Sequence, residues 1–360
     1  MGILNSTKLK SHDIKEIHIW SYRVLLDDIP SKPWLIKHYS KELEKSLIHQ
    51  IFWQAFKLAK LVSREKCDIL YTTDASTFCR FKPMVVMSQD LSCYENEIIK
   101  SYGYFNYALF RLYSILILQN IAFRSSAGVI FLTKYASKLV QSSCGHLKNF
   151  SIIPHGISKE FKLAQNNKEW PINNDEPIRC IYVSPLLLYK HQWIVVRAIY
   201  ELRKKGYNII LTLIGGGSGK AKKLLNNQIN KLDPNKLFVF QMDFVSQKEI
   251  INQLKSSHIF LFASSCENMP ITLLEAMAVG IPIACSSKGP MSEILENGGI
   301  YFDPKKHYSI SEAVEKIIIN ILLRDKNKLN AKQISNKYSW ERCAHETWDF
   351  ISGTYWRINK

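Results

Sequence analysis

The sequence lacks a CxxC pair, a recognisable signal peptide and any long unbroken hydrophobic run. Its eight cysteines are spread over 360 residues, mostly within apolar, strand-like stretches, so we expect reduced, buried thiols rather than a disulfide framework. The most apolar helical segment, Phe105–Phe123, is interrupted by Arg111, Ser114 and a Gln-Asn pair. A membrane-spanning helix needs about 20 nearly unbroken apolar residues. We therefore expect a cytoplasmic protein without a membrane span.

Long runs of like charge are also missing, as are zinc-finger and RNP-like patterns. The chain nevertheless has a formal net charge of +17, which favours anionic partners. Nucleic acid, an acidic membrane surface and phosphorylated small molecules are the three classes to consider. Because no nucleic-acid motif is present, we expect no nucleic-acid partner.

Short apolar runs alternate with amphipathic segments along the chain, in two sets divided by a polar stretch. Such runs indicate parallel sheets covered by helices on both faces. We therefore predict an α/β protein with two doubly wound domains and a cleft between them. The predicted boundaries are an N-terminal domain over 1–163, a linker over 164–178, a second domain over 179–335, and C-terminal helices over 336–360 that pack back across the interface. The strand-like runs are 16–22, 67–73, 83–89, 128–133, 150–156, 178–184, 209–217, 236–242, 258–264 and 281–287.

The stretch ENMPITLLEAMAVGIP, residues 267–282, has the signals of a short helix over about 270–279. Pro270 suits the first helical position, Gly280 suits the position after the last turn, and Pro282 prevents continuation. Because a strand precedes this helix, its N-terminus faces the edge of the sheet where ligands of open α/β folds bind. The backbone N–H groups of Ile271 and Thr272 are therefore predicted to form an anion site.

Two acids, Glu267 and Glu275, flank this helix start. An ionised carboxylate only accepts hydrogen bonds, so sugar and ribose hydroxyls are suitable partners on either side of a phosphate. The alternative is that Glu275 lies on a solvated face and Glu267 complements the helix dipole. Spacing alone leaves both interpretations open.

The segment 267–295 resembles the E-x7-E segment of retaining GT-B glycosyltransferases of family 4. The resemblance continues, in consistent order, through 152–161, 182–192, 211–219 and 298–304. It implies the GT-B fold, with two Rossmann-like domains and an interdomain cleft, and a nucleotide-sugar donor bound by the C-terminal domain. It also implies that Glu267 contacts the donor sugar as a catalytic residue and that Glu275 contacts the ribose.

The resemblance assigns further donor contacts. Lys190 corresponds to the phosphate-binding lysine, which would neutralise charge on the leaving diphosphate, although a lone surface lysine is the alternative. Where the family usually has an arginine, five residues earlier, this chain has Pro185, and we expect His191 to supply the missing contact. Gly215 and Gly216 either let the backbone approach the nucleotide or simply form a tight turn. The turn residues expected to contact donor sugar or phosphate are Asn268, Met269, Pro270, Ile271 and Thr272.

Acceptor-side residues are expected in the N-terminal domain. Gln89 and Asp90 occupy the place where relatives often have a His-Asp pair, and we assign Asp90 to position the acceptor hydroxyl. Gln89 can hydrogen-bond but cannot act as a base, and a structural strand-end role for Asp90 is the alternative. Asp74 and Arg80 are the other expected acceptor contacts. His155, near the expected hinge, is interpreted as structural.

The resemblance predicts transfer of a sugar from a nucleoside diphosphate, with retention, to a hydroxyl of a growing, lipid-linked glycan of O-antigen or capsule type. A non-catalytic nucleotide-sugar-binding or scaffold protein is the alternative. No DxD motif is present, since Asp27 and Asp28 are adjacent, so we expect neither a metal nor another cofactor. The 105–123 segment either packs in the core or lies on an anionic membrane, at whose inner face lipid-linked acceptors reside. The Gly-rich first βα unit of relatives is expected to be missing.

Overall fold

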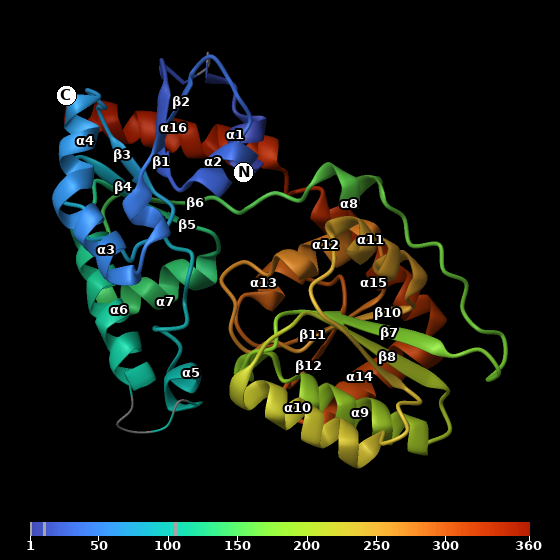
Figure 1. Ribbon diagram of the computed structural model, residues 1–360. Coiled ribbons are helices and arrows are strands. Elements are labelled where there is room, and N and C mark those ends of the chain that lie inside the picture. The colour runs from blue at the N-terminus through green and yellow to red at the C-terminus, as the bar shows by residue number, and fades with distance from the viewer. Residues whose placement is uncertain (1, 10–11, 102, 104–106) are drawn as a thin grey trace. The chain divides into compact units, whose positions relative to one another are not determined.

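The computed structural model describes residues 2–9, 12–101, 103 and 107–360, which form two compact units (Figure 1). The first comprises Met1–Gly156 with Ser339–Lys360, and the second comprises Ile157–Tyr338. In the described residues of both units, every strand pairing is parallel. The α/β class and the two Rossmann-like domains predicted from the sequence are confirmed.

The second unit contains one six-stranded sheet with the order β12-β11-β10-β7-β8-β9. The chain starts in the middle at β7, builds outward through β8 and β9, and then returns to place β10 on the other side of β7. The direction of winding therefore changes between β7 and β10, which is the point where ligands of this fold bind. The strands are β7 Ile178–Val183, β8 Ile209–Ile214, β9 Val239–Met242, β10 Ile259–Phe262, β11 Ile283–Ser286 and β12 Ile300–Phe302.

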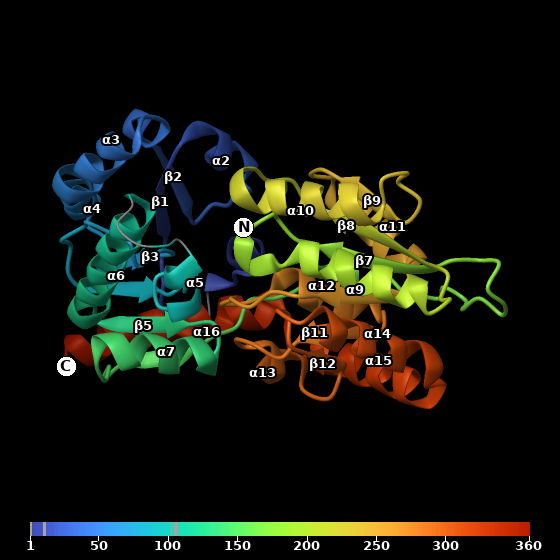
Figure 2. The same ribbon diagram turned by 90° about the horizontal axis from the view of Figure 1, so that it is seen from below.

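Helices cover both faces of this sheet, α9, α10 and α14 on one face and α8, α11, α12 and α15 on the other (Figures 1 and 2). All four residues of β10 and all four of β11 are buried, because helices cover both faces of these strands, and apart from Ser286 their side chains are hydrophobic. The helices are α8 Lys159–Leu163, α9 Gln192–Lys204, α10 Gly219–Leu232, α11 Gln247–Ser256, α12 Ile271–Val279, α13 Met291–Leu295, α14 His307–Ile319 and α15 Ile321–Ser335, with a 3-10 turn, η4, at Leu188–Lys190.

The first unit has a four-stranded sheet, β3-β4-β5-β6, and a separate two-stranded sheet, β1-β2. The four-stranded sheet packs on a core that includes Val62, Val86, Phe123, Phe131 and Val140. The strands are β1 Ile17–Ser21, β2 Leu35–Tyr39, β3 Leu70–Thr72, β4 Met84–Met87, β5 Gly128–Phe131 and β6 Phe150–Ile152. The helices are α1 Gly2–Ser6, α2 Arg23–Asp28, α3 Leu47–Phe52, η3 Trp53–Leu58, α4 Ala59–Arg64, α5 Asn96–Ser101, α6 Tyr107–Ser125, α7 Lys134–Cys144 and α16 Trp340–Ile358, with a 3-10 turn, η2, at Lys41–Glu44.

The last helix, α16, belongs to the first unit although it follows the whole second unit in the chain. The backbone of Gly156, the last residue before the second unit, lies directly against Trp340. A Cβ on Gly156 would stand 2.1 Å from the Trp340 nitrogen, so no side chain fits there. The His155 and Trp340 rings are in contact, with their centroids 5.3 Å apart. Burial lowers the pKa of His155 to about 4, as suits a structural imidazole.

The predicted domain boundaries need correction. The first unit ends at Gly156 rather than at 163, so α8 belongs to the second unit, and so do residues 336–338. The predicted linker over 164–178 is also part of the second unit. Asn166 is buried there, and its amide donates to the carbonyl oxygens of Leu254 at 2.7 Å and Ser257 at 2.8 Å. These bonds fix a polar stretch whose composition is typical of a flexible connection.

Residues 105 and 106 of the apolar segment predicted over 105–123 lie outside the described part of the chain, and the rest of the segment lies in α6. Its C-terminal half packs in the core, where Ala122 and Phe123 are buried. Several other large side chains of α6 are exposed: Tyr107, Phe110, Tyr113, Ile117 and Ile121. The core interpretation therefore describes the C-terminal half of this helix, whereas the membrane-surface interpretation stays a prediction. Among the described helices, none has the length and apolar character needed to cross a membrane.

Candidate functional site

A lysine and a glutamate meet where the winding of the second sheet reverses. Lys190 lies in η4, which follows β7, and Glu267 lies in the loop that follows the neighbouring strand β10. The Lys190 ammonium donates to the Glu267 carboxylate. The two side chains are only 8% and 14% exposed, so this ion pair is mostly shielded from water. The sequence predicted both residues in the site but did not predict that they pair with each other.

The surroundings hold Lys190 in place. Its carbonyl oxygen accepts a hydrogen bond from the Tyr182 hydroxyl at 2.9 Å, and its ammonium lies 5.6 Å from the centre of the Phe262 ring. The next residue, His191, has a left-handed backbone with φ of +52° and directly precedes α9. Its Nε2 lies 3.0 Å from the Ser265 hydroxyl oxygen. Tyr182 and Ser265 were not predicted from the sequence, because nothing in their spacing distinguishes them from ordinary strand and loop residues.

The helix α12 begins at Ile271, one residue later than predicted, and ends at Gly280 in the left-handed conformation with φ of +75°. Its first internal bonds are donated by Leu273 and Leu274 to the carbonyl oxygen of Pro270. Ile271 and Thr272 precede them, so their N–H groups are at the helix end as the sequence predicts. Asn268, Met269 and Pro270 are buried in the turn before the helix.

Glu275 lies one turn inside α12 and is half-buried. Burial raises the pKa of its carboxyl group to about 7. A freely solvated position, the alternative interpretation from the sequence, does not agree with this. A half-buried carboxyl group on a helix whose N-terminus faces the ligand edge is suited to accept hydrogen bonds from hydroxyl groups.

The glycines after β8 let two loops pack closely. Gly215 has φ of +124°, and a Cβ there would stand 2.3 Å from the carbonyl oxygen of Ser184. Gly216 accepts a backbone hydrogen bond from Leu186 at 3.0 Å. These loops follow β7 and β8, and they line a small cavity of about 40 Å³. Loop packing therefore accounts for Gly215, whereas the predicted contact of these glycines with a nucleotide stays a prediction.

Pro185, which stands where relatives have an arginine, lies in the same loop and is exposed. Its ring has no hydrogen-bonding group, so it replaces no phosphate contact. A larger cavity, of about 520 Å³, lies elsewhere in the second unit and is lined by Leu163, Gln165 and Lys255 among others. It contains none of the predicted site residues.

The predicted acceptor-side residues all lie in the first unit. Asp74 follows β3 and Asp90 follows β4, and because these strands are parallel neighbours both acids are at the same edge of the sheet. Each acid accepts a backbone hydrogen bond from the residue two positions on, at 2.8 Å, in a local turn. Gln89 and Arg80 are exposed. The geometry is that of turn-forming acids, and their predicted contact with an acceptor stays a prediction.

A further polar group in the first unit was missed by the sequence analysis. Glu95 accepts a hydrogen bond from the Tyr135 hydroxyl, and burial raises the pKa of its carboxyl group. Nearby in the chain, the thiol of Cys93 lies 3.6 Å from Gln119, whose amide donates to the Ser76 hydroxyl at 3.0 Å. A single carboxylate in a polar stretch gives no sequence signal for such a position.

The segment that carries the ion pair and α12 is similar to known proteins. Residues 164–339 match the family Glycosyl transferases group 1. This group 1 segment contains Lys190, Glu267 and Glu275. One curated relative, an uncharacterized glycosyltransferase of Methanocaldococcus jannaschii, is 26% identical over 70% of this chain and 66% of its own length. A second glycosyltransferase of that organism is 30% identical over 49% of this chain and 45% of its own length. The chain thus spans about half to two thirds of these relatives. The family match and the two relatives support a glycosyltransferase enzyme.

Solved structures share the fold over almost the whole chain. Sucrose-phosphate synthase from Thermosynechococcus elongatus superposes with a TM-score of 0.76 at 14% identity, covering 99% of this chain and 91% of that one. Anabaena HepE in complex with UDP and glucose superposes with a TM-score of 0.68 at 16% identity, covering 92% and 90%. These neighbours are GT-B glycosyltransferases, so the predicted fold is confirmed.

Proposed function

We propose that this protein is a retaining glycosyltransferase that takes its sugar from a nucleoside diphosphate sugar. The observation that carries the proposal is the shielded Lys190–Glu267 pair at the winding reversal, beside the N-terminus of α12. The ammonium and the helix N-terminus suit a diphosphate, whereas the two carboxylates suit hydroxyl groups. The complex of HepE with UDP and glucose supports a donor of this kind.

In the proposed reaction the donor separates Lys190 from Glu267. The ammonium then neutralises charge on the leaving diphosphate, and Glu267 accepts hydrogen bonds from the sugar. Glu275 accepts from the ribose, and Asp90 positions the acceptor hydroxyl. No metal ion or other cofactor takes part in this proposal, because the cation at the diphosphate is supplied by Lys190.

We assign the acceptor to a lipid-linked glycan of O-antigen or capsule type. One relative, O-antigen chain mannosyltransferase B of Escherichia coli, supports this class by its name, and the chain is also similar to Protein CapJ of Staphylococcus aureus and to an amylovoran biosynthesis glycosyltransferase of Erwinia amylovora. Their identities to this chain are 23%, 24% and 30%. A cytoplasmic enzyme at the inner face of the membrane would meet such an acceptor.

The test is a panel of radiolabelled UDP- and GDP-sugars offered to the purified protein with lipid-linked glycan acceptors. We expect transfer from one donor, with the new bond in the α configuration by NMR. Calorimetry with UDP and GDP, run in parallel, separates binding from chemistry. Binding without transfer would instead favour a non-catalytic nucleotide-sugar-binding or scaffold protein, a role with which the exposed Pro185, in the loop after β7, agrees.

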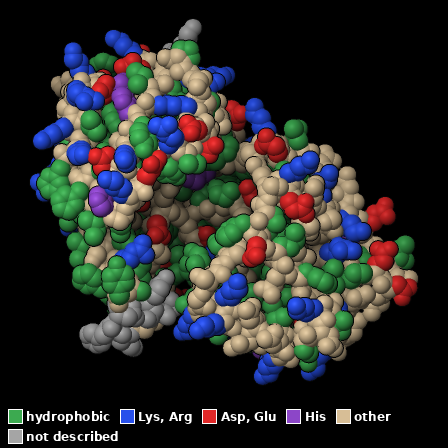
Figure 3. All heavy atoms as spheres, in the orientation of Figure 1, with side chains coloured by type: hydrophobic (Ala, Val, Ile, Leu, Met, Phe, Trp, Pro, Cys, Tyr) green, Lys and Arg blue, Asp and Glu red, His purple; other side chains and the backbone are tan. Residues whose placement is uncertain are grey.

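The exposed side of α6 is the proposed membrane contact. Phe110, Ile117 and Ile121 are 71%, 61% and 59% exposed, and hydrophobic side chains gather on the surface of this unit in Figure 3. In the same unit, α3 and η3 expose Phe52 and Phe56. The net charge of +17 favours an anionic surface over a neutral one. Apolar side chains that enter the headgroup region would then hold the enzyme near its acceptor.

We expect the double variant Phe110→Ser/Ile117→Ser to bind vesicles containing anionic phospholipid about tenfold more weakly than the parent, because two large apolar side chains no longer enter the interface. Vesicle co-sedimentation measures this. The matched control is Leu322→Ser/Leu329→Ser, which removes equally exposed apolar side chains from α15. Equal losses in both double variants would contradict a specific contact through α6.

A further inference from the structure

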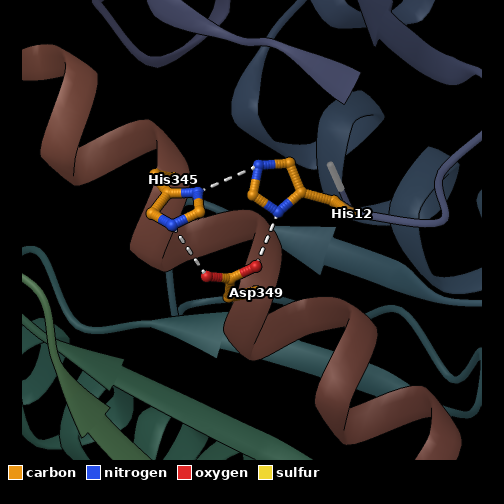
Figure 4. Close-up of side chains that lie close together, drawn as sticks. All are labelled: His12, His345 and Asp349. Atoms are coloured by element: carbon orange, nitrogen blue, oxygen red, sulfur yellow. Dashed lines mark hydrogen bonds and ion pairs between the residues drawn. The ribbon is translucent and has the colours of Figure 1, made fainter. Parts of the chain in front are cut away.

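Two histidines and an aspartate meet on the last helix of the first unit. His345 and Asp349 stand one turn apart on α16, and His12 reaches them from the N-terminal segment (Figure 4). His12 Nδ1 lies 2.6 Å from Asp349 Oδ1, and His345 Nε2 lies 3.3 Å from Asp349 Oδ2. The remaining nitrogens of the two rings, His12 Nε2 and His345 Nδ1, face each other at 3.3 Å.

The two facing ring nitrogens leave room for a cation. A carboxylate only accepts, so the 2.6 Å contact of His12 with Asp349 places an N–H at Nδ1 and leaves the lone pair of His12 Nε2 directed at His345. When the proton of the His345 ring is at Nε2, on the Asp349 side, His345 Nδ1 also presents a lone pair to His12. Two lone pairs at 3.3 Å repel unless a proton or a metal cation lies between them.

The spacing fits a metal ion. Two nitrogens bound to a tetrahedral zinc ion at about 2.0–2.1 Å lie about 3.3 Å apart. Asp349 would then contact both ligand rings through their other nitrogens, which is the usual carboxylate–histidine–metal arrangement that fixes the tautomer and the ring orientation. One ligand atom from each of the three residues lies within 4.8 Å of the others.

One of the three side chains is buried, and the other two are exposed to solvent. The His12 side chain is only 2% exposed, whereas those of His345 and Asp349 are 60% and 52% exposed. A metal ion can therefore enter from solvent, and water can complete its coordination. Imidazole nitrogens favour zinc and similar transition metals over magnesium or calcium.

We propose that His12 and His345, oriented by Asp349, bind one zinc-type divalent cation that fastens the N-terminal segment to α16. Other contacts already place this segment on the helix. The Trp348 indole donates to the Thr7 hydroxyl at 2.8 Å, and a Cβ on Gly2 would stand 2.1 Å from the Trp340 ring. The proposal is independent of sugar transfer, since none of these residues belongs to the site described above.

The test is calorimetric titration of the chelator-treated full-length protein with zinc chloride, together with its melting temperature in zinc or chelator. We expect one zinc per chain and a higher melting temperature with zinc. His345→Asn should abolish this binding, and because the side chain is mostly exposed the variant should fold. Asp349→Asn should weaken it by about 10- to 100-fold, because the rings lose their orienting carboxylate.

A second histidine cluster provides the matched control. His18 and His38 on β1 and β2, with Glu65, also offer ligand atoms within 4.8 Å of one another. His18→Asn should leave zinc binding unchanged if the ion lies on α16. Absence of saturable binding in the parent, undiminished binding by His345→Asn, or loss caused by His18→Asn alone would each overturn the proposal.

Discussion

Replacing Lys190 with methionine will lower the free energy of unfolding by about 3–5 kcal/mol, because it leaves the Glu267 carboxylate largely buried without its partner. Glu267→Gln will have a similar effect, because the buried Lys190 ammonium then lacks its carboxylate partner. The double variant Lys190→Met/Glu267→Gln removes both charges and should recover most of the loss, since a neutral pair of similar size costs little. Urea unfolding of the parent and the three variants at pH 7 measures these differences.

The double variant also separates stability from catalysis. It should fold, yet lose at least about 100-fold in sugar transfer, because the cation for the diphosphate and the acceptor for the sugar hydroxyls are both gone. The control is Lys205→Met/Glu315→Gln, which removes an exposed ion pair of the same unit whose atoms are 2.7 Å apart. A folded Lys190→Met/Glu267→Gln protein with parental transfer would show that the pair is structural only.

Replacing Glu275 with glutamine will make the protein more stable at pH 8 and leave its stability unchanged at pH 4. Burial raises the pKa of this carboxyl group from 4.5 to about 7, so ionisation is harder in the folded state than in the unfolded state. At pH 4 the group is protonated in both states and costs nothing. As the pH rises from 4.5 through 7, the folded state loses up to about 3 kcal/mol, which the variant does not lose.

Unfolding of the parent and Glu275→Gln from pH 4 to pH 8 checks this prediction. Glu312→Gln is the control, because this glutamate lies on the exposed side of α14 in the same unit. Equal stability of parent and Glu275→Gln at pH 8 would contradict the raised pKa. If Glu275 also binds the ribose, the affinity of the parent for the nucleoside diphosphate should rise between pH 6 and pH 8, because only the ionised form accepts both hydroxyl hydrogens.

Much of this fold was predictable because central strands such as β4, β5, β10 and β11 are buried on both faces. Each of the ten apolar runs predicted as strands contains one, and α12 begins within one residue of its predicted start. Two strands, β2 and β12, were missed. β2 carries Lys37 and His38 and lies in a two-stranded sheet, so it needs no continuous apolar run. The length of β12 does not explain the second omission, since β3 and β6 also have three residues and were predicted.

The candidate site was predictable in its residues but less so in its geometry. Glu267 and Glu275 stand out beside the start of one short helix, whereas their roles and that of Lys190 were assigned through the family resemblance. Their pairing and burial depend on strand order, which spacing does not contain: β7 and β10 are neighbours although about 80 residues separate them. The domain boundary was wrong for a related reason, since Asn166 has a loop-like sequence context but is bonded within the second unit.

The contact between Gly156 and Trp340 has a consequence for how the protein is built. The chain leaves the first unit after Gly156 and re-enters it beside that residue. Residues 157–338 therefore have the arrangement of a domain inserted into another domain. A peptide of a few residues would suffice to join residues 156 and 339, and the first unit would then be a single continuous chain. Such an arrangement allows residues 157–338 to be exchanged as one piece without altering the fold of the first unit.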